Sequence, residues 1–171
     1  MDPQAVIEVF RRNVTEHYFD LIGRVGRREF WYFVLASFVV GVAAAIIDSI
    51  IRTGLLSPLV GLALLPPLTG LGARRLQDIG RDGSLVWVWT IASVVLQAIG
   101  LLTALTLLAS PLGALRSFYY FLTFGALVSL ISLAVLVISV VLIYFWVQPG
   151  TEGENKYGPA PKAVPVAPKS A

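Results

Sequence analysis

The sequence contains no cysteine and only one histidine, His17. The lack of cysteine excludes disulfides, thiol nucleophiles, iron–sulfur clusters and cysteine-based zinc sites. With a single histidine the chain cannot assemble a Ser-His-Asp or Cys-His catalytic set, and it contains no H-E-x-x-H, phosphate-loop or dinucleotide-binding fingerprint. We therefore expect a protein that is not an enzyme and has no metal and no cofactor. His17 itself is expected to be a hydrogen-bonding surface residue.

Charge is also scarce: 13% of the residues are charged, whereas soluble domains typically carry about 25%. Hydrophobic residues make up 57% of the chain, and the mean hydropathy is +0.80. A soluble monomer of this composition would expose large apolar patches, and such hydrophobicity excludes disorder for most of the chain. The composition indicates an integral membrane protein.

Four apolar windows are long enough to cross a bilayer as helices, which takes about 20 residues each. They cover residues 30–51, 54–73, 85–108 and 118–147. The last window is long enough to tilt or to extend into the headgroup region. Pro66 and Pro67 interrupt the second window, so a kink or break is expected there, with a re-entrant hairpin as the alternative. The predicted fold is an all-α integral membrane protein with four transmembrane helices.

Basic residues are distributed unevenly around these windows. Most of them precede the first window, separate the second from the third, or follow the fourth: Arg11, Arg12, Arg24, Arg27, Arg28, Arg74, Arg75, Arg81, Lys156, Lys162 and Lys169. The other two connections contain one each, Arg52 and Arg116. Because basic residues concentrate in cytoplasmic loops, this distribution places both termini in the cytoplasm. The first window is longer than the apolar core of a signal peptide and is expected to remain as an uncleaved anchor.

Residues 1–29 and 148–171 flank the transmembrane region at 30–147. Between Ala5 and Phe19 the apolar residues recur near helical spacing. This pattern predicts an amphipathic helix that lies in the membrane interface or, equally well, packs on the cytoplasmic loops. An arginine-rich segment follows it. The C-terminal segment is rich in proline and is predicted to be an extended cytoplasmic tail.

Two segments on the predicted cytoplasmic side combine arginines, carboxylates and glycines. Residues 23–32 contain Arg24, Arg27, Arg28 and Glu29, and residues 74–84 contain Arg74, Arg75, Asp78, Arg81 and Asp82. We expect the carboxylate of Asp78 or Asp82 to pair with the first arginine group. Glu29 or Asp20 is expected to pair with the second group. Bidentate arginine–carboxylate pairs would hold the two segments in one geometry.

Three interpretations of these segments differ in function. Arginines at the membrane boundary can act as topological anchors alone, but anchoring does not account for the interleaved carboxylates and glycines. A structural clamp that holds the cytoplasmic end of the helices together accounts for both, and we favour it. A phosphate or lipid-headgroup site is the third interpretation, because arginines beside glycine-rich turns suit phosphate oxygens. Asp78 and Asp82 could also bind Mg²⁺, although the surrounding arginines would compete.

Three ordered blocks of sequence carry a resemblance to a known family. They are Tyr18-Phe19-Asp20, Gly23-Arg24 and Arg27-Arg28-Glu29-Phe30-Trp31-Tyr32; then Arg74-Arg75-Leu76, Asp78 and Gly80; then Gly153, Asn155-Lys156-Tyr157-Gly158 and Pro161. Together they resemble the DUF805 family of small bacterial inner-membrane proteins. The resemblance implies a helical protein of the inner membrane and brings no agreed activity, substrate or catalytic residue. The family usually has histidine where Gln77 stands and tryptophan near Ser84, and an amide can replace only the hydrogen bonds of a histidine.

The third block follows the last predicted span and returns to the side of the arginine-rich segments. We expect Asn155, Tyr157 and Gly158 to dock onto those segments, with the Tyr157 ring covering arginine side chains. Equal protease sensitivity from Pro149 to Ala171 would count against this docking.

Two polar residues fall inside the predicted spans. Asp48 lies near the outer end of the first span and stands four residues before Arg52, which favours a structural ion pair over a functional site. Gln97 lies in the middle of the third span and is expected to hydrogen-bond to another helix. Two pairs of small residues have the spacing that allows close helix approach: Gly41 with Ala45, and Gly125 with Ser129.

These observations favour a non-enzymatic scaffold whose helices present a rigid cytoplasmic surface. We expect this surface to meet anionic lipid headgroups or an unidentified membrane or cytoplasmic protein, and homo-oligomerisation stays open. The alternative is an oligomeric transporter or channel for small solutes or ions, because prolines and a polar residue inside spans are features of transport pathways. Nucleic acid is not an expected partner, since the net charge is only +3 and the basic residues follow the predicted topology.

Overall fold

The computed structural model describes residues 3–109 and 112–161, and all regular secondary structure in these ranges is helical. The helices are α1 (Pro3–Thr15), α2 (Arg27–Ile51), α3 (Leu56–Asp78), α4 (Leu85–Ala109) and α5 (Gly113–Val147). The last four are long and apolar enough to cross a membrane. Each predicted window therefore corresponds to one helix of the structure.

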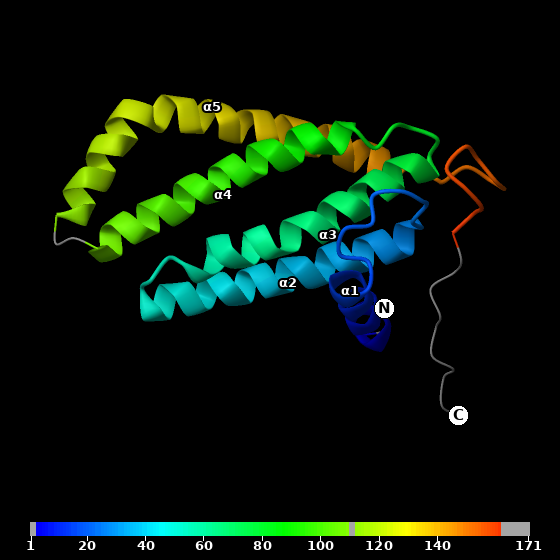
Figure 1. Ribbon diagram of the computed structural model, residues 1–171, viewed down its shortest axis with the longest axis horizontal. Helices are drawn as coiled ribbons and strands as arrows, with labels where there is room; N and C mark the ends of the chain where they lie inside the picture. Colours follow the sequence, from blue (N-terminus) through cyan, green and yellow to red (C-terminus); the bar gives the residue numbers. More distant parts are fainter. Residues whose placement is uncertain (1–2, 110–111, 162–171) are drawn as a thin grey trace.

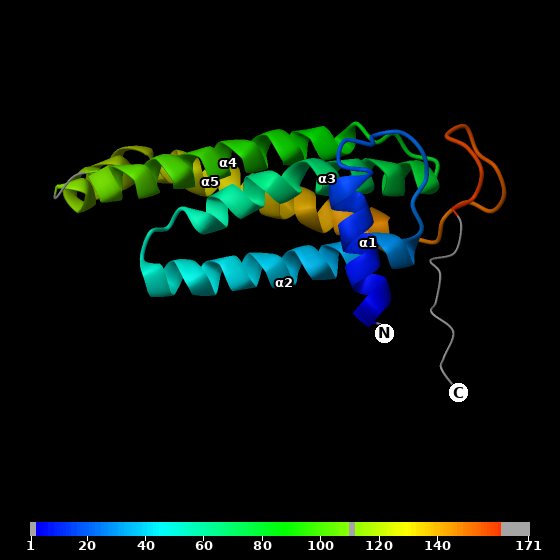
Figure 2. The same ribbon diagram turned by 60° about the horizontal axis from the view of Figure 1, so that its bottom comes forward.

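The four long helices lie side by side, and each packs mainly against its neighbours in the sequence (Figure 1). α3 lies between α2 and α4, and α5 packs on α4 with a smaller contact to α3. The short helix α1 crosses α2 at one end of the bundle, and the segment after α5 lies at that same end (Figure 2). We term this the polar end and define it as residues 3–30, 74–85 and 146–161.

The buried core lies toward the polar end and is centred on α3. Its buried apolar side chains include Phe30, Phe33, Leu71, Leu76, Val86, Leu142 and Trp146. Within α3, every residue from 69 to 78 is buried. Two glycines allow this close packing: a Cβ at Gly70 would overlap the backbone oxygen of Asp20, and a Cβ at Gly72 would lie 2.9 Å from the Trp146 ring.

Helix α3 continues through Pro66 and Pro67, so the re-entrant hairpin considered from the sequence is wrong. Because proline has no amide hydrogen, Pro67 leaves the carbonyl of Ala63 without its usual donor one turn ahead. The hydroxyl of Tyr18, in the segment after α1, donates to that carbonyl at 2.6 Å. A side chain from outside the helix thus replaces the missing bond, which is how membrane helices tolerate proline.

Several helix ends differ from the boundaries expected from hydropathy. α2 begins at Arg27 and α3 ends at Asp78, so much of both arginine-rich segments is helical. α5 begins at Gly113, before the predicted start at 118, and the N-terminal helix ends at Thr15, before Phe19. The backbone hydrogen bonds of a helix continue through charged turns that hydropathy excludes, so apolar windows underestimate helix length.

The surface of α5 is mostly apolar and exposed. Its large buried side chains, Leu142 and Trp146, lie in the last turns at the polar end. The most apolar part of the helix has a mean hydropathy of 3.0, and exposed leucine, valine and phenylalanine line its outward faces. A hydrocarbon environment covers such a surface at no cost, whereas water does not.

Candidate functional site

Asp78, the last residue of α3, is the centre of a buried charged cluster at the polar end. Its Oδ1 accepts a hydrogen bond of 3.0 Å from Nε of Arg24, and its Oδ2 forms an ion pair with Arg75. The side chains of Arg24, Arg75 and Asp78 are 1%, 0% and 4% exposed, so the pairs are shielded from water. The expected pairing of Asp78 with the first arginine group is present, through Arg24.

Arg75 connects this cluster to the end of α5. Its guanidinium donates to the carbonyl oxygen of Trp146 at 3.0 Å and also to that of Gln148. These carbonyls lie at the C-terminus of α5, where the helix dipole favours a cation. The Trp146 indole in turn donates to the carbonyl of Gly72 at 3.1 Å, so α3 and α5 are bonded in both directions.

Arg24 connects the same carboxylate to the segment after α5. Its guanidinium donates to the carbonyl oxygens of Thr151 at 2.6 Å, Gly153 at 2.5 Å and Gly158 at 3.2 Å. The Thr151 amide and hydroxyl both donate to the backbone oxygen of Asp78, at 2.9 and 3.0 Å. Arg24 and Arg75 share a single carboxylate, and these backbone carbonyls give Arg24 the further hydrogen-bond acceptors that its buried guanidinium needs.

Gln77 and Asn155 extend these contacts to the segment before α2. The Gln77 side chain accepts from the Gly23 amide at 3.0 Å and donates to the Leu21 carbonyl at 3.1 Å. The Asn155 side chain donates to the Gln77 carbonyl at 3.0 Å, and Asn155 and Gly158 exchange two backbone hydrogen bonds. The docking expected for Asn155 and Gly158 is therefore seen in the structure.

The position of Tyr157 differs in part from the expectation. Its amide donates to Oδ1 of Asn155 at 2.9 Å, which fixes the turn. Its ring lies beside the ammonium group of Lys156, with the nitrogen 4.9 Å from the ring centre, and its contact with arginine side chains stays a prediction. We term the polar clamp the set Arg24, Arg75, Gln77, Asp78, Thr151 and Asn155.

The carboxylates expected to pair with residues 74–84 have other partners. Glu29 forms an ion pair with Arg12 of α1, and the Asp20 carboxylate accepts a hydrogen bond of 2.6 Å from Nδ1 of His17. Neither forms a direct ion pair with the second arginine group among the described residues, although the negative charges of both Glu29 and Asp20 attract the buried Arg74 guanidinium. The reason is the crossing of α1 over α2, which brings Arg12 to Glu29 and which the sequence pattern did not predict.

Arg74 is buried on the side of α3 that faces α1. Its guanidinium donates to Oδ1 of Asn13 at 3.2 Å, and the Asn13 amide donates to the Val9 carbonyl at 2.9 Å. The Nε atoms of Arg74 and Arg12 are buried and have no hydrogen-bond partner among the described residues. Arg74 therefore attaches α3 to α1 and does not take part in the polar clamp.

The remaining charged residues of the two segments lie outside the polar clamp: Arg27, Arg28, Arg81 and Asp82. The first two are exposed in the first turn of α2. The Arg81 guanidinium lies over the Phe145 ring at 4.2 Å, and Oδ1 of Asp82 accepts from the Ser84 amide at 2.9 Å just before α4. Asp82 thus helps to start a helix and does not pair with an arginine across the segments.

The cluster offers hydrogen-bond donors but no metal ligand set. Among the described residues, no three histidine, aspartate or glutamate side chains are placed to hold a metal ion. Both oxygens of Asp78 already bond to arginines, and Asp82 bonds to a backbone amide. Asp78 therefore has no free oxygen with which to bind the Mg²⁺ ion considered for these two carboxylates.

Sequence reasoning did not identify Thr151, Trp146 or Asn13 as parts of these networks. Thr151 lies close before the third family-like block and could have been included with it. Trp146 accepts from Arg75 through its backbone, and no sequence pattern reports a backbone acceptor. Asn13 lies on the inner face of α1, where a single polar residue among apolar ones was the available signal.

Asp48, inside α2, binds the start of α3 and not Arg52. Its carboxylate accepts from the amides of Leu56 at 3.1 Å and Ser57 at 2.6 Å, and from the hydroxyls of Thr53 at 2.8 Å and Ser57 at 2.7 Å. The expected ion pair with Arg52 is wrong. The first amides of a helix have no internal acceptor and carry partial positive charge, so they take the carboxylate.

Gln97, in the middle of α4, packs against Gly61 of α3. A Cβ at Gly61 would overlap the Gln97 amide nitrogen. No hydrogen bond joins this amide to another helix within the described residues, so that expectation is wrong. The Gln97 amide packs closely against the backbone of α3 at Gly61, but no hydrogen-bond acceptor of α3 lies within its reach.

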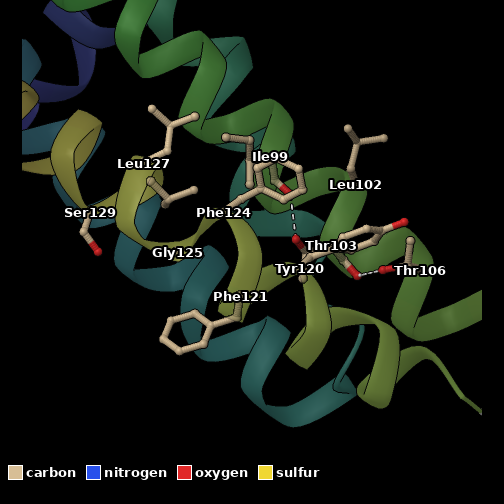
Figure 3. A pocket seen from close by; sticks show the side chains of 11 residues that line it. Ile99, Leu102, Thr103, Thr106, Tyr120, Phe121, Phe124, Gly125, Leu127 and Ser129 are labelled. Carbon is tan, nitrogen blue, oxygen red and sulfur yellow. Dashed lines mark hydrogen bonds between the residues drawn. The ribbon is translucent and has the colours of Figure 1, made fainter.

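The small-residue pairs do not mark close helix contacts. Gly41 has no atom within 4 Å of the position of a Cβ, and Gly125 faces only the Phe121 ring of its own helix. Gly125 and Ser129 instead border a cavity of about 630 Å³ between α4 and α5 (Figure 3). Its wall is mainly apolar, and the Thr103 hydroxyl bonds to the Ile99 carbonyl of its own helix.

Four apolar helices with a buried charged network at one end define a multi-pass helical membrane protein. The chain belongs to the DUF805 family, a family of unknown function, whose sequence profile matches residues 18–159. The matched region contains the polar clamp from Arg24 to Asn155 and all four long helices.

Two proteins of Escherichia coli strain K12 are similar to this chain. Inner membrane protein YhaI is 36% identical over 74 residues, which are 42% of this chain and 63% of that protein. This chain thus spans less than two thirds of that relative. Inner membrane protein YhaH is 23% identical over 158 residues, which are 89% of this chain and 95% of that protein. No solved structure matches the chain at a significant level.

Proposed function

We propose that this protein is a non-enzymatic scaffold of the bacterial inner membrane whose cytoplasmic end is held rigid by the polar clamp. The observation that carries the proposal is the burial of Asp78 between Arg24 and Arg75. Through this carboxylate the segments before α2, at the end of α3 and after α5 form one network. A fully bonded buried network fixes one arrangement of its elements, which suits a protein that presents a surface.

The proposed topology places the polar end in the cytoplasm, with both termini on that side. Among the described residues, Arg52 and Arg116 are the basic residues at the opposite end of the bundle. The concentration of the others at the polar end supports this orientation, because basic residues stay on the cytoplasmic side. The names of the two relatives support the inner membrane as the location.

The surface that the clamp supports is basic and lies at the membrane boundary. Arg27 and Arg28 are exposed in the first turn of α2, and Arg81 is exposed beside the start of α4. Basic side chains just cytoplasmic of a span attract anionic headgroups by about 1 kcal/mol each. We infer contact with anionic lipid here, and the docked segment at 150–161 offers a fixed surface to a membrane or cytoplasmic protein, or to a second copy.

A lipid-dependent stability measurement tests the proposed contact. Purified protein is placed in nanodiscs of phosphatidylcholine with or without phosphatidylglycerol, and its thermal unfolding is measured. Phosphatidylglycerol should raise the Tm of the wild type, and the double variant Arg27→Gln, Arg28→Gln should lose this increase. Arg116→Gln, at the opposite end, is the matched control and should keep it. An equal Tm in both lipids would contradict the lipid contact.

Partner binding is tested separately by a photo-crosslinker at Glu152, an exposed residue of the docked segment. The scaffold proposal expects one protein, or this chain itself, to be crosslinked in stoichiometric yield in native membranes. Asp78→Asn should reduce the yield, because the segment is then less firmly docked. Diffuse crosslinking that is unchanged in this variant would argue against a defined surface.

The alternative function, an oligomeric route for small solutes, has one observation in its favour. Gln97 places an uncharged amide at the middle of α4, beside a cavity that α2, α3 and α4 share. Polar groups at this depth are typical of transport pathways. Flux of ions or small neutral solutes into liposomes that contain the protein, above that of empty liposomes, would support transport.

A further inference from the structure

A cavity of about 430 Å³ lies between α2, α3 and α4, within the apolar part of the bundle. This volume is in the range of about 300–1,000 Å³ that small-molecule sites occupy. Its wall is apolar except for four uncharged polar side chains: Ser37, Ser57, Ser93 and Gln97. None of the described residues that line it is charged, so the cavity suits a neutral molecule.

The polar side chains of the cavity are largely unused by the protein. The Ser37 hydroxyl is buried and has no hydrogen-bond partner in residues 3–109 and 112–161, and within the same ranges Ser93 and Gln97 form no side-chain hydrogen bond. Ser57, by contrast, bonds to Asp48 at 2.7 Å. In a bilayer no bulk water reaches such groups, so each unmet donor or acceptor calls for a partner inside the site.

A glycine in the neighbouring helix α3 makes room for the Gln97 amide. Gly61 of α3 leaves the space that the amide occupies, and any side chain at that position would collide with it. Gly41 of α2 leaves the opposite wall open. Ser93 precedes Gln97 by one helical turn, so its hydroxyl lies on the same face of α4. Ser93 and Gln97 of α4 therefore line one cavity, which residues of α2 and α3 enclose from the other sides.

The depth of the cavity restricts the class of ligand. Gln97 lies midway along α4, which places it about 18 Å from either helix end at about 1.5 Å per residue. The glycerol esters and headgroups of phospholipids lie near the two boundaries of the hydrocarbon core, away from this level. A neutral ring carried on an apolar chain, in contrast, is soluble at this depth. Phe38 and Trp89 add aromatic surfaces to the wall against which a flat ring can stack.

We propose that this cavity binds the head ring of a lipid-soluble quinone. The quinone carbonyl oxygens accept hydrogen bonds from the Gln97 amide, with the Ser93 hydroxyl as a further donor. The site is independent of the polar clamp, which lies at the polar end of the bundle. The proposal concerns binding alone, and it stands or falls separately from the scaffold function.

Trp89 provides the readout, because a bound quinone quenches the fluorescence of an adjacent indole. The full chain in phosphatidylcholine nanodiscs is titrated with a short-chain ubiquinone analogue. We expect saturable quenching that largely disappears in Trp89→Phe, in which the other tryptophans remain. Gln97→Leu should weaken the apparent affinity at least tenfold. Ser132→Ala is the matched control, since its hydroxyl bonds to its own helix on the exposed side of α5, and it should bind as the wild type does.

Three results would overturn the proposal. The first is quenching that rises linearly with quinone and is equal in all variants. The second is saturation by diacylglycerol but not by quinone, which would assign the site to lipid ester carbonyls. The third is a wild-type dimer that Gln97→Leu loses while its quinone binding is unchanged, which would assign the amide to a contact between copies. If Gln97→Leu does not fold, Ser93→Ala is measured against the same criteria.

Discussion

Tyr18 and Ala63 are joined by a hydrogen bond of 2.6 Å from the phenol hydroxyl to the backbone carbonyl. Ala63 stands one turn before Pro67, whose missing amide hydrogen leaves this carbonyl without an intrahelical donor. The contact supplies the hydrogen bond that Pro67 removes from α3. It also attaches the segment after α1 to the middle of α3, which places Asp20 against Gly70.

Tyr18→Phe should destabilise the protein by about 0.5–1.5 kcal/mol, the usual net contribution of one intramolecular hydrogen bond, because the Ala63 carbonyl then has no donor from Tyr18. Thermal unfolding in detergent, followed by tryptophan fluorescence, measures the change. Tyr119→Phe, at an exposed position of α5, is the control and should have little effect.

A double-mutant cycle distinguishes this explanation from a general packing effect. Pro67→Ala restores an amide hydrogen that can bond to the Ala63 carbonyl within the helix. In that background Tyr18→Phe should cost much less than in the wild type. An equal cost in both backgrounds would contradict the assigned role of Tyr18.

Asp78→Asn should destabilise the protein by roughly 3–5 kcal/mol, because two buried arginines then lose their shared counter-charge. The same variant should release the segment after α5 and raise the rate of tryptic cleavage at Lys156, which is exposed. Asp82→Asn is the matched control, since its carboxylate is exposed and bonds only to the Ser84 amide among the described residues. Unchanged Tm and cleavage in Asp78→Asn would remove the basis for the clamp.

Asp48→Ala should cost about 0.5–2 kcal/mol, the usual range for the loss of a helix-capping side chain. Arg52→Gln should be nearly neutral, because the carboxylate bonds to Thr53, Leu56 and Ser57. Both variants are compared by thermal unfolding in the same detergent. A larger loss in Arg52→Gln than in Asp48→Ala would restore the ion pair as the main interaction.

The membrane-spanning helices could be predicted from the sequence because hydrocarbon length and apolar runs are directly related. The window from Phe118 to Val147 was long and apolar enough to predict a span, and α5 contains all of it. The charged turns at Arg27 and Asp78 lie outside the predicted windows, since a hydropathy window ends where charge begins. The passage through Pro66 and Pro67 needed knowledge of Tyr18, which is distant in sequence.

The candidate site was predictable in its residues but only partly in its pairs. The pairing of Arg24 with Asp78 was predictable because a carboxylate in one charged segment needs a cation, and the other segment supplies arginines. The pairing of Glu29 with Arg12 depends on the crossing of α1 over α2, a tertiary feature that spacing does not encode. The carbonyl acceptors of Arg75 were not predictable, because every residue carries a carbonyl and only the fold selects two of them.

Site-specific labelling of the intact bacterium tests the central claim most directly. The chain has no cysteine, so single variants Leu112→Cys and Glu152→Cys each offer one thiol at an exposed position. A membrane-impermeant maleimide added to whole cells should label Leu112→Cys and should reach Glu152→Cys only after the membrane is opened. Labelling of Glu152→Cys in intact cells, with Leu112→Cys protected, would contradict a scaffold whose clamped end faces the cytoplasm.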